Sequence, residues 1–238
     1  MSPATDDPPE ESDAVLLEGH AAMTSVQQIE IDPNNKYEIS GWFKSVGAKP
    51  SKVYLGLRPL DENRDNIWPS QCSRMLDSET ELVEEYPAGG LVVKVKDASK
   101  WVGEGERYVA VDVDTSGEYS DLPNRRLAKI KSIRQTGDHW EIDLAGPVDP
   151  NYSSPPYAKG TAVRQHGTQG VHIYCGANGV EVPNEWTYLK GEIRGMATGV
   201  VQNSFWPKTK YVSVVAAGNY MEGPEVKVLV GGLRFREK

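Results

Sequence analysis

Cysteine is nearly absent from this chain of 238 residues, and the two that it has, Cys72 and Cys175, lie far apart in the sequence. Two cysteines are too few for a disulfide scaffold, and they lack the short spacing of zinc ligands. Two interpretations stay open: one long-range disulfide bridge, or two free thiols.

The sequence also lacks long hydrophobic runs. No apolar stretch approaches the roughly 20 residues of a membrane helix, so we expect no insertion into a membrane. Residues 1–13 have neither the basic start nor the apolar stretch of a secretory signal. They are rich in proline and acidic side chains, and we predict that 1–13 is a disordered acidic leader.

An excess of positive charge is missing as well. The chain has 26 Lys and Arg residues against 34 Asp and Glu residues, for a formal net charge of −8. A protein that binds a nucleic-acid duplex needs a dense basic face to neutralise phosphates, so we expect no nucleic-acid partner. Five of the acids and none of the bases lie within residues 1–13, so residues 14–238 are close to neutral.

Motifs of the common enzyme classes do not occur. The chain has no Gly-x-Ser-x-Gly, no His-Glu-x-x-His, no phosphate-binding Gly-Lys loop and no dinucleotide fingerprint. We therefore expect a protein that is not an enzyme and that has no cofactor, apart from the structural calcium considered below.

Alternation of apolar and polar residues is the dominant pattern, and it predicts half-buried strands. Turn residues separate the alternating segments, as in 32–35, 61–66 and 177–179. The pattern predicts an all-β chain with a jelly-roll β-sandwich that carries a small inserted β-barrel-like module. We place the discontinuous sandwich at 14–80 and 166–238 and the module at 81–165; two domains in tandem are the alternative.

Three early segments, Ile29–Pro33, Tyr37–Lys44 and Val53–Leu57, resemble the opening of galactose-binding-like jelly-roll modules. The later segments Lys210–Val214 and Val226–Phe235 resemble their ending. Such modules occur as carbohydrate-binding parts of polysaccharide-degrading enzymes and in phage tail-fibre and adhesin proteins. Many of them bind a structural calcium through an acidic pair in the last strand, where this chain has Gly231-Gly232.

Aromatic residues fall on the strand parity that the aliphatic residues leave free. If Ile39 and Phe43 point into the core, the period of two turns Trp42 outward. Rings on a sheet surface suit a sugar, because pyranoses stack their C–H faces on aromatics while Arg and His bind the polar groups. The alternative is that the inserted module or an N-terminal segment covers these rings, which would make them part of a second core layer. The predicted ligand-binding residues are Trp42, Tyr54, Arg58, His172, Tyr174, Arg194 and Tyr211.

Two further sites are predicted in loops. Trp68, Trp206 and Tyr220 form a secondary candidate site, with plugging of the open end of the sandwich as the alternative. Asp61, Asn63 and Asp65 place oxygen ligands at alternate positions, as calcium loops do, although a hairpin turn has the same composition.

These patterns predict a non-catalytic carbohydrate-binding module whose partner is a polysaccharide or cell-surface glycan, acidic glycans included, with an extracellular or surface location. A structural or adhesin domain of a surface or virion fibre is the second hypothesis, with oligomer contacts on the same aromatic face. A polysaccharide lyase that uses His166, His172 and Tyr174 is the third, because some jelly-roll lyases use such residues to move a proton.

Overall fold

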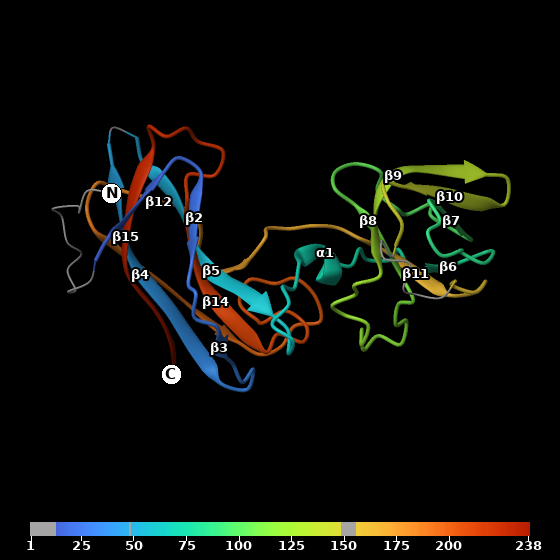
Figure 1. Ribbon diagram of the computed structural model, residues 1–238, viewed down its shortest axis with the longest axis horizontal. Coiled ribbons are helices and arrows are strands. Elements are labelled where there is room, and N and C mark those ends of the chain that lie inside the picture. Colours follow the sequence, from blue (N-terminus) through green and yellow to red (C-terminus); the bar gives the residue numbers. More distant parts are fainter. Residues whose placement is uncertain (1–12, 48, 149–155) are drawn as a thin grey trace. The chain divides into compact units, whose positions relative to one another are not determined.

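The computed structural model describes residues 13–47, 49–148 and 156–238 (Figure 1). The predicted leader lies outside these residues except for Asp13. Contacts divide the chain into two compact units. The first consists of the described residues up to Ile67 together with Val171–Ala197 and Val201–Lys238, and the second of Trp68–Gly170 with Thr198–Val200. The module limits predicted at 81 and 165 stay a prediction.

The first unit is a sandwich of two antiparallel sheets. In spatial order, the first sheet contains β1 (Val15–Glu18), β15 (Lys227–Glu237), β4 (Lys36–Val46) and β13 (Thr187–Arg194). The second contains β12 (Ile173–Val182), β5 (Ser51–Leu60), β14 (Tyr211–Gly218) and β2 (Ala21–Thr24), and β3 (Ile29–Glu30) also pairs with β14. This strand order is that of a jelly roll. The predicted all-β sandwich is confirmed.

The core of this unit follows the alternation in the sequence. Ile39 and Phe43 of β4 and Leu55 and Leu57 of β5 are fully buried. Because side chains of a strand alternate between the two faces of its sheet, their neighbours Trp42, Tyr54 and Arg58 lie on the outer faces and are only half-buried.

The second unit is a single six-stranded sheet that closes on itself. Its strands in order are β6 (Thr80–Glu81), β11 (Ala162–His166), β8 (Tyr108–Val111), β9 (Leu127–Thr136), β10 (His139–Leu144) and β7 (Val92–Val95). Leu82 bridges Val95, and the amide of Val83 donates to the carbonyl of Lys94 at 3.1 Å, which joins the first and last strands. The closed sheet leaves few unpaired edges and surrounds a core rich in valine.

One short helix, α1 (Pro69–Cys72), occurs in the described part of the chain. None of the helical segments in the described residues has the length and apolar character that crossing a membrane requires.

Candidate functional site

The residues predicted to bind one ligand lie on two different outer faces of the sandwich. Trp42 and Arg194 belong to the sheet of β1, β15, β4 and β13. Tyr54, Arg58 and Tyr211 lie on the opposite sheet, with Tyr174 of β12 and His172 just before it. The structure therefore does not gather the predicted set into one site.

The first of these faces brings together side chains that are distant in sequence. Trp42 of β4 pairs with Tyr188 of β13 on one side and with Gly231 of β15 on the other. In the next outward row along the strands, Ser40 of β4 pairs with Lys190 of β13 on one side and with Arg234 of β15 on the other. We call the two rows the aromatic–basic face, which consists of Tyr188, Trp42, Gly231, Lys190, Ser40 and Arg234.

The aromatic row is a pair of rings beside a glycine. The ring centroids of Trp42 and Tyr188 are 5.0 Å apart at an interplanar angle of 46°, and Tyr188 is 41% exposed. Gly231 adds no side chain next to Trp42, and Trp42 itself is half-buried. The Trp42 indole nitrogen has no hydrogen-bond partner among the described residues.

The second row is positively charged. Lys190 and Arg234 pair with Ser40 from either side; both basic side chains are exposed, and Ser40 between them is buried. Among the described residues, neither Lys190 nor Arg194 forms an ion pair, so their charges stay available to a ligand.

Farther along the same sheet, acids and bases neutralise one another. Glu192 bonds Lys36 at 2.6 Å and Lys238 at 2.7 Å, and these hydrogen bonds, led by that of Lys238, lower its pKa to about 2. Arg236 bonds Glu38 at 2.8 Å and, together with Lys238, lowers the pKa of that carboxyl. Lys36, Lys238 and Arg236 are therefore engaged by carboxylates of this sheet, in contrast to Lys190.

The opposite face carries a tyrosine cluster that the chain itself partly covers. The ring centroids of Tyr54 and Tyr174 are 5.3 Å apart, and His172 meets Tyr174 edge-on at 5.8 Å. A Cβ on Gly56 would lie 2.2 Å from the carbonyl oxygen of Ile173, so the backbone of the neighbouring strand β12 approaches β5 closely at this glycine.

Burial also sets the ionisation of this cluster. Burial and the nearby Arg58 guanidinium lower the pKa of His172 to about 4, so its imidazole is neutral at pH 7. Burial raises the pKa of the Tyr174 hydroxyl. Tyr211 lies apart from this pair, with the Arg64 guanidinium 4.2 Å from its ring centroid.

The secondary loop site needs a correction at Trp206. This side chain is fully buried, and its indole N–H donates to the carbonyl of Val201 at 3.0 Å, so it packs in the core of the first unit. Tyr220 is 60% exposed and contacts His20 edge-on, with 4.9 Å between centroids. Trp68 is 46% exposed and belongs to the second unit.

The Asp61 loop uses its carboxylate to hold a turn. One oxygen of Asp61 accepts the amides of Asn63 and Asp65, each at 2.9 Å. Arg64 has a φ of 66°, in the left-handed region that such turns contain. Within the described ranges, no group of three or more His, Cys, Asp or Glu side chains could hold a metal ion. The hydrogen bonds are those of the hairpin turn given above as the alternative to a calcium loop.

His166 belongs to a buried ionic cluster in the second unit. Its Nδ1 lies 2.7 Å from the Ser70 carbonyl, and its Nε2 lies 3.2 Å from Nε of Arg164. Arg164 also bonds Asp121 at 2.8 Å and Glu79 at 3.4 Å. Burial lowers the pKa of His166 to about 4. Both ring nitrogens are engaged and the side chain is fully buried, so the imidazole is enclosed by the protein.

Both cysteines are free thiols. Cys72 is fully buried in the second unit, and Cys175 lies in the first, where burial raises its pKa to about 12.

Sequence reasoning missed Tyr188, Lys190 and Arg234. The signal was present, because Tyr188 and Lys190 alternate with Leu189, Gly191 and Ile193. Comparison of the chain with protein-family models, with curated proteins and with solved structures found no match.

Proposed function

We propose that this protein is a non-catalytic carbohydrate-binding module and that the aromatic–basic face binds an acidic polysaccharide. The observation that carries the proposal is the register that sets the rings of Trp42 and Tyr188 one row from Lys190 and Arg234. Residues two apart on a strand are separated by about 7 Å, so one sugar chain can reach both rows.

The chemistry of the two rows fits the two parts of an acidic sugar. The apolar C–H face of a pyranose packs on aromatic rings, and Tyr188 offers an exposed one. A uronate or sulfate accepts charge-assisted hydrogen bonds, which Arg234 can donate in bidentate geometry and Lys190 as a point charge.

A sugar site on this face bears on two predictions made from the sequence, the resemblance to a family and the location of the protein. The resemblance to galactose-binding-like modules is compatible with a sugar site on a jelly roll, and it stays a prediction. Polysaccharides of this class are found on cell surfaces and outside cells, so we propose an extracellular or surface location.

Affinity electrophoresis in gels that contain a polyuronate, a sulfated polysaccharide or a neutral glucan tests the proposal. We expect retardation by the acidic polymers. Tyr188→Ala should weaken binding about tenfold, because an aromatic contact of this kind contributes about 1 kcal/mol or more. Lys190→Ala should weaken it in the acidic gels and leave the neutral gel unchanged.

Tyr54→Phe on the opposite face is the matched control and should bind like the parent protein. Each variant should keep its melting temperature within a few degrees, since both substituted side chains of the first face are exposed. Equal retardation of the parent and Tyr188→Ala proteins, or no retardation in any gel, would refute the proposal. A stable trimer on size-exclusion chromatography that Tyr188→Ala dissociates would favour the fibre hypothesis.

A further inference from the structure

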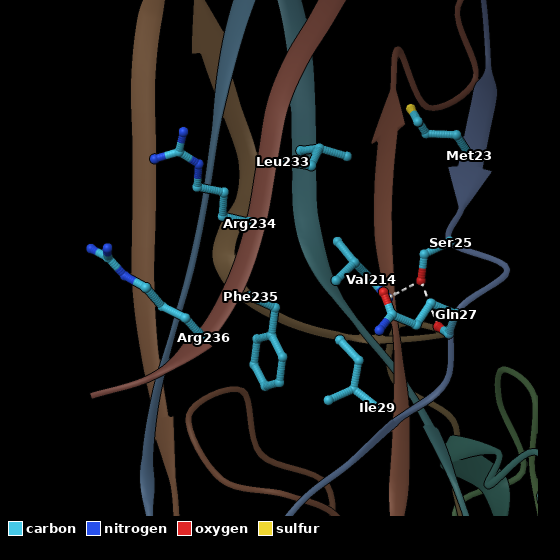
Figure 2. A pocket seen from close by; sticks show the side chains of 9 residues that line it. All are labelled: Met23, Ser25, Gln27, Ile29, Val214, Leu233, Arg234, Phe235 and Arg236. Atoms are coloured by element: carbon cyan, nitrogen blue, oxygen red, sulfur yellow. Dashed lines mark hydrogen bonds between the residues drawn. The ribbon is translucent and has the colours of Figure 1, made fainter. Parts of the chain in front are cut away.

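A groove of about 510 Å³ opens in the first unit between β15 and the β2–β3 segment (Figure 2). Its apolar lining consists of Met23, Ile29, Val214, Leu233 and Phe235. Two polar side chains of the lining are satisfied within the chain: the Ser25 hydroxyl donates to the Gln27 carbonyl at 2.9 Å, and Arg236 bonds Glu38 at 2.8 Å. An arginine on the outer face of the second sheet has no such partner.

This arginine is Arg58 of β5, a cation that the protein half-buries without pairing it. Among the described residues, its side chain forms no ion pair or hydrogen bond, and its Nε is shielded from solvent. Taking a guanidinium out of water is costly, and a counter-charge normally offsets that cost. The missing partner therefore predicts an anionic ligand for Arg58.

The side chains that flank Arg58 across the sheet are uncharged. Ser213 of β14 pairs with Arg58 on one side and is fully buried. On the other side, Ile173 pairs with Leu57, which places His172 opposite Arg58. Burial and the Arg58 charge lower the pKa of His172 to about 4, so its imidazole is neutral at pH 7. A single positive charge is thus available at this position of the sheet.

His172 is also incompletely bonded. Its Nδ1 is shielded from solvent and has no hydrogen-bond partner within the described ranges. Arg58 and His172 therefore bring two buried polar atoms without partners to neighbouring strands. Buried polar atoms are usually hydrogen-bonded, and a cluster of unbonded ones indicates a site that another molecule completes.

Aromatic rings continue from this position along the same face. His172 meets Tyr174 edge-on, with 5.8 Å between ring centroids, and Tyr174 lies 5.3 Å from Tyr54 at an angle of 54°. Burial raises the pKa of Tyr174, and the hydroxyls of Tyr54 and Tyr220 raise it further, so Tyr220 also lies near. We call Arg58 and these four rings the arginine–tyrosine site.

The arrangement selects both the charge and the shape of the ligand. A single guanidinium compensates one negative charge, and its planar fork matches the two oxygens of a carboxylate. His172 and Tyr174 are perpendicular to each other and offer no flat platform, which favours edge-to-face contact with another aromatic ring over stacking of a sugar. Tyr174 follows His172 by two positions, a step of about 7 Å along an extended chain, which one ring with a carboxylate spans.

We propose that the arginine–tyrosine site binds a small aromatic carboxylate. The carboxylate accepts hydrogen bonds from the terminal nitrogens of Arg58, and the ring packs against His172 and Tyr174. The ligand differs in class from the polysaccharide proposed above, and β5 and β4 belong to opposite sheets of the sandwich. The two sites can therefore be tested separately.

Isothermal titration calorimetry of the full chain with benzoate tests this site, and we expect saturable binding of one benzoate per chain. Benzamide has the same shape without the charge and should bind about tenfold more weakly or worse, because it loses the charge-assisted hydrogen bonds to Arg58. Acetate keeps the charge without the ring and should also bind about tenfold more weakly, because it loses the aromatic contact and its buried area.

Substitutions at Arg58 test the assignment of the charge. Arg58→Gln should abolish benzoate binding, and Arg58→Lys should weaken it about tenfold, since lysine keeps the charge without the planar fork. Lys52→Gln is the matched control, because it removes the same charge from the same strand and lies 3.9 Å from Glu181 rather than near the rings. It should bind benzoate like the parent. Each variant should keep its melting temperature within a few degrees, because Arg58 has no ion pair to lose.

Three results would overturn the proposal. One is equal affinity for benzoate and benzamide, and another is unchanged benzoate binding by Arg58→Gln. The third is binding of glucuronate as tight as that of benzoate, which would make a sugar acid the ligand of this face. Retardation by acidic polysaccharide should be the same for Arg58→Gln and the parent, so failure here is separable from failure of the proposed sugar site.

Discussion

Replacing Asp121 by asparagine should destabilise the second unit far more than an ion pair normally does. The side chains of Arg164 and Asp121 are only 1% and 8% exposed, and their atoms are 2.8 Å apart. Asp121→Asn removes the negative charge while keeping the size of the side chain. The buried Arg164 guanidinium then faces a neutral amide in place of a carboxylate.

The expected magnitude follows from what remains around Arg164. Breaking a buried pair by removing one partner costs about 3–5 kcal/mol. Glu79 remains 3.4 Å away, but its side chain is 39% exposed and is screened by water. We therefore expect a loss of about 3 kcal/mol, at the lower end of that range.

Hydrogen exchange of the β11 amides, followed by mass spectrometry, measures this loss in the second unit alone. Glu106→Gln is the matched control, because Glu106 bonds Lys129 at 2.7 Å with both side chains about half exposed. It should cost less than about 1 kcal/mol. If Asp121→Asn costs no more than Glu106→Gln, the reasoning about the buried charge is refuted.

Three further predictions concern other buried groups. The pKa of His166 is lowered from 6.5 to about 4, so between these two pH values only the unfolded chain takes up the proton. The free energy of opening measured by hydrogen exchange of the β11 amides should therefore fall by about 3 kcal/mol from pH 7 to pH 4. His166→Gln should lose this pH dependence. Gly56→Ala should lower the stability of the first unit to denaturant by about 3 kcal/mol, because its Cβ would meet the Ile173 carbonyl, whereas Gly146→Ala, with open space around it, should change the stability of its own unit, the second, only little. Alkylation of Cys175 at pH 8 should be slow in the folded protein and fast in denaturant, because burial raises its pKa to about 12; labelling in the folded state at the denatured rate would contradict this.

The all-β class could be predicted because strand formation leaves a local pattern. In β4 and β5, the residues on the aliphatic parity are buried, and Trp42 and Tyr54 take the other parity. The same local information did not predict the burial of Trp206. Its neighbour Pro207 indicates a loop, whereas in the structure this loop packs into the core.

Which outer face each ring occupies required the tertiary structure. Trp42 and Tyr54 share a parity rule, but β4 and β5 belong to facing sheets, and so their outward sides point in opposite directions. The cover over Gly56 comes from Ile173, far along the chain, and no local pattern indicates that approach.

The sequence by itself determined which side of each strand a residue takes, because side-chain direction is set by the alternating backbone of that strand alone. Only the tertiary structure decided that Tyr188, Trp42 and Gly231 form one row and that His172 lies opposite Arg58. Both depend on the register between strands that are distant in sequence, and hydrogen bonds and packing set that register only when the chain is folded.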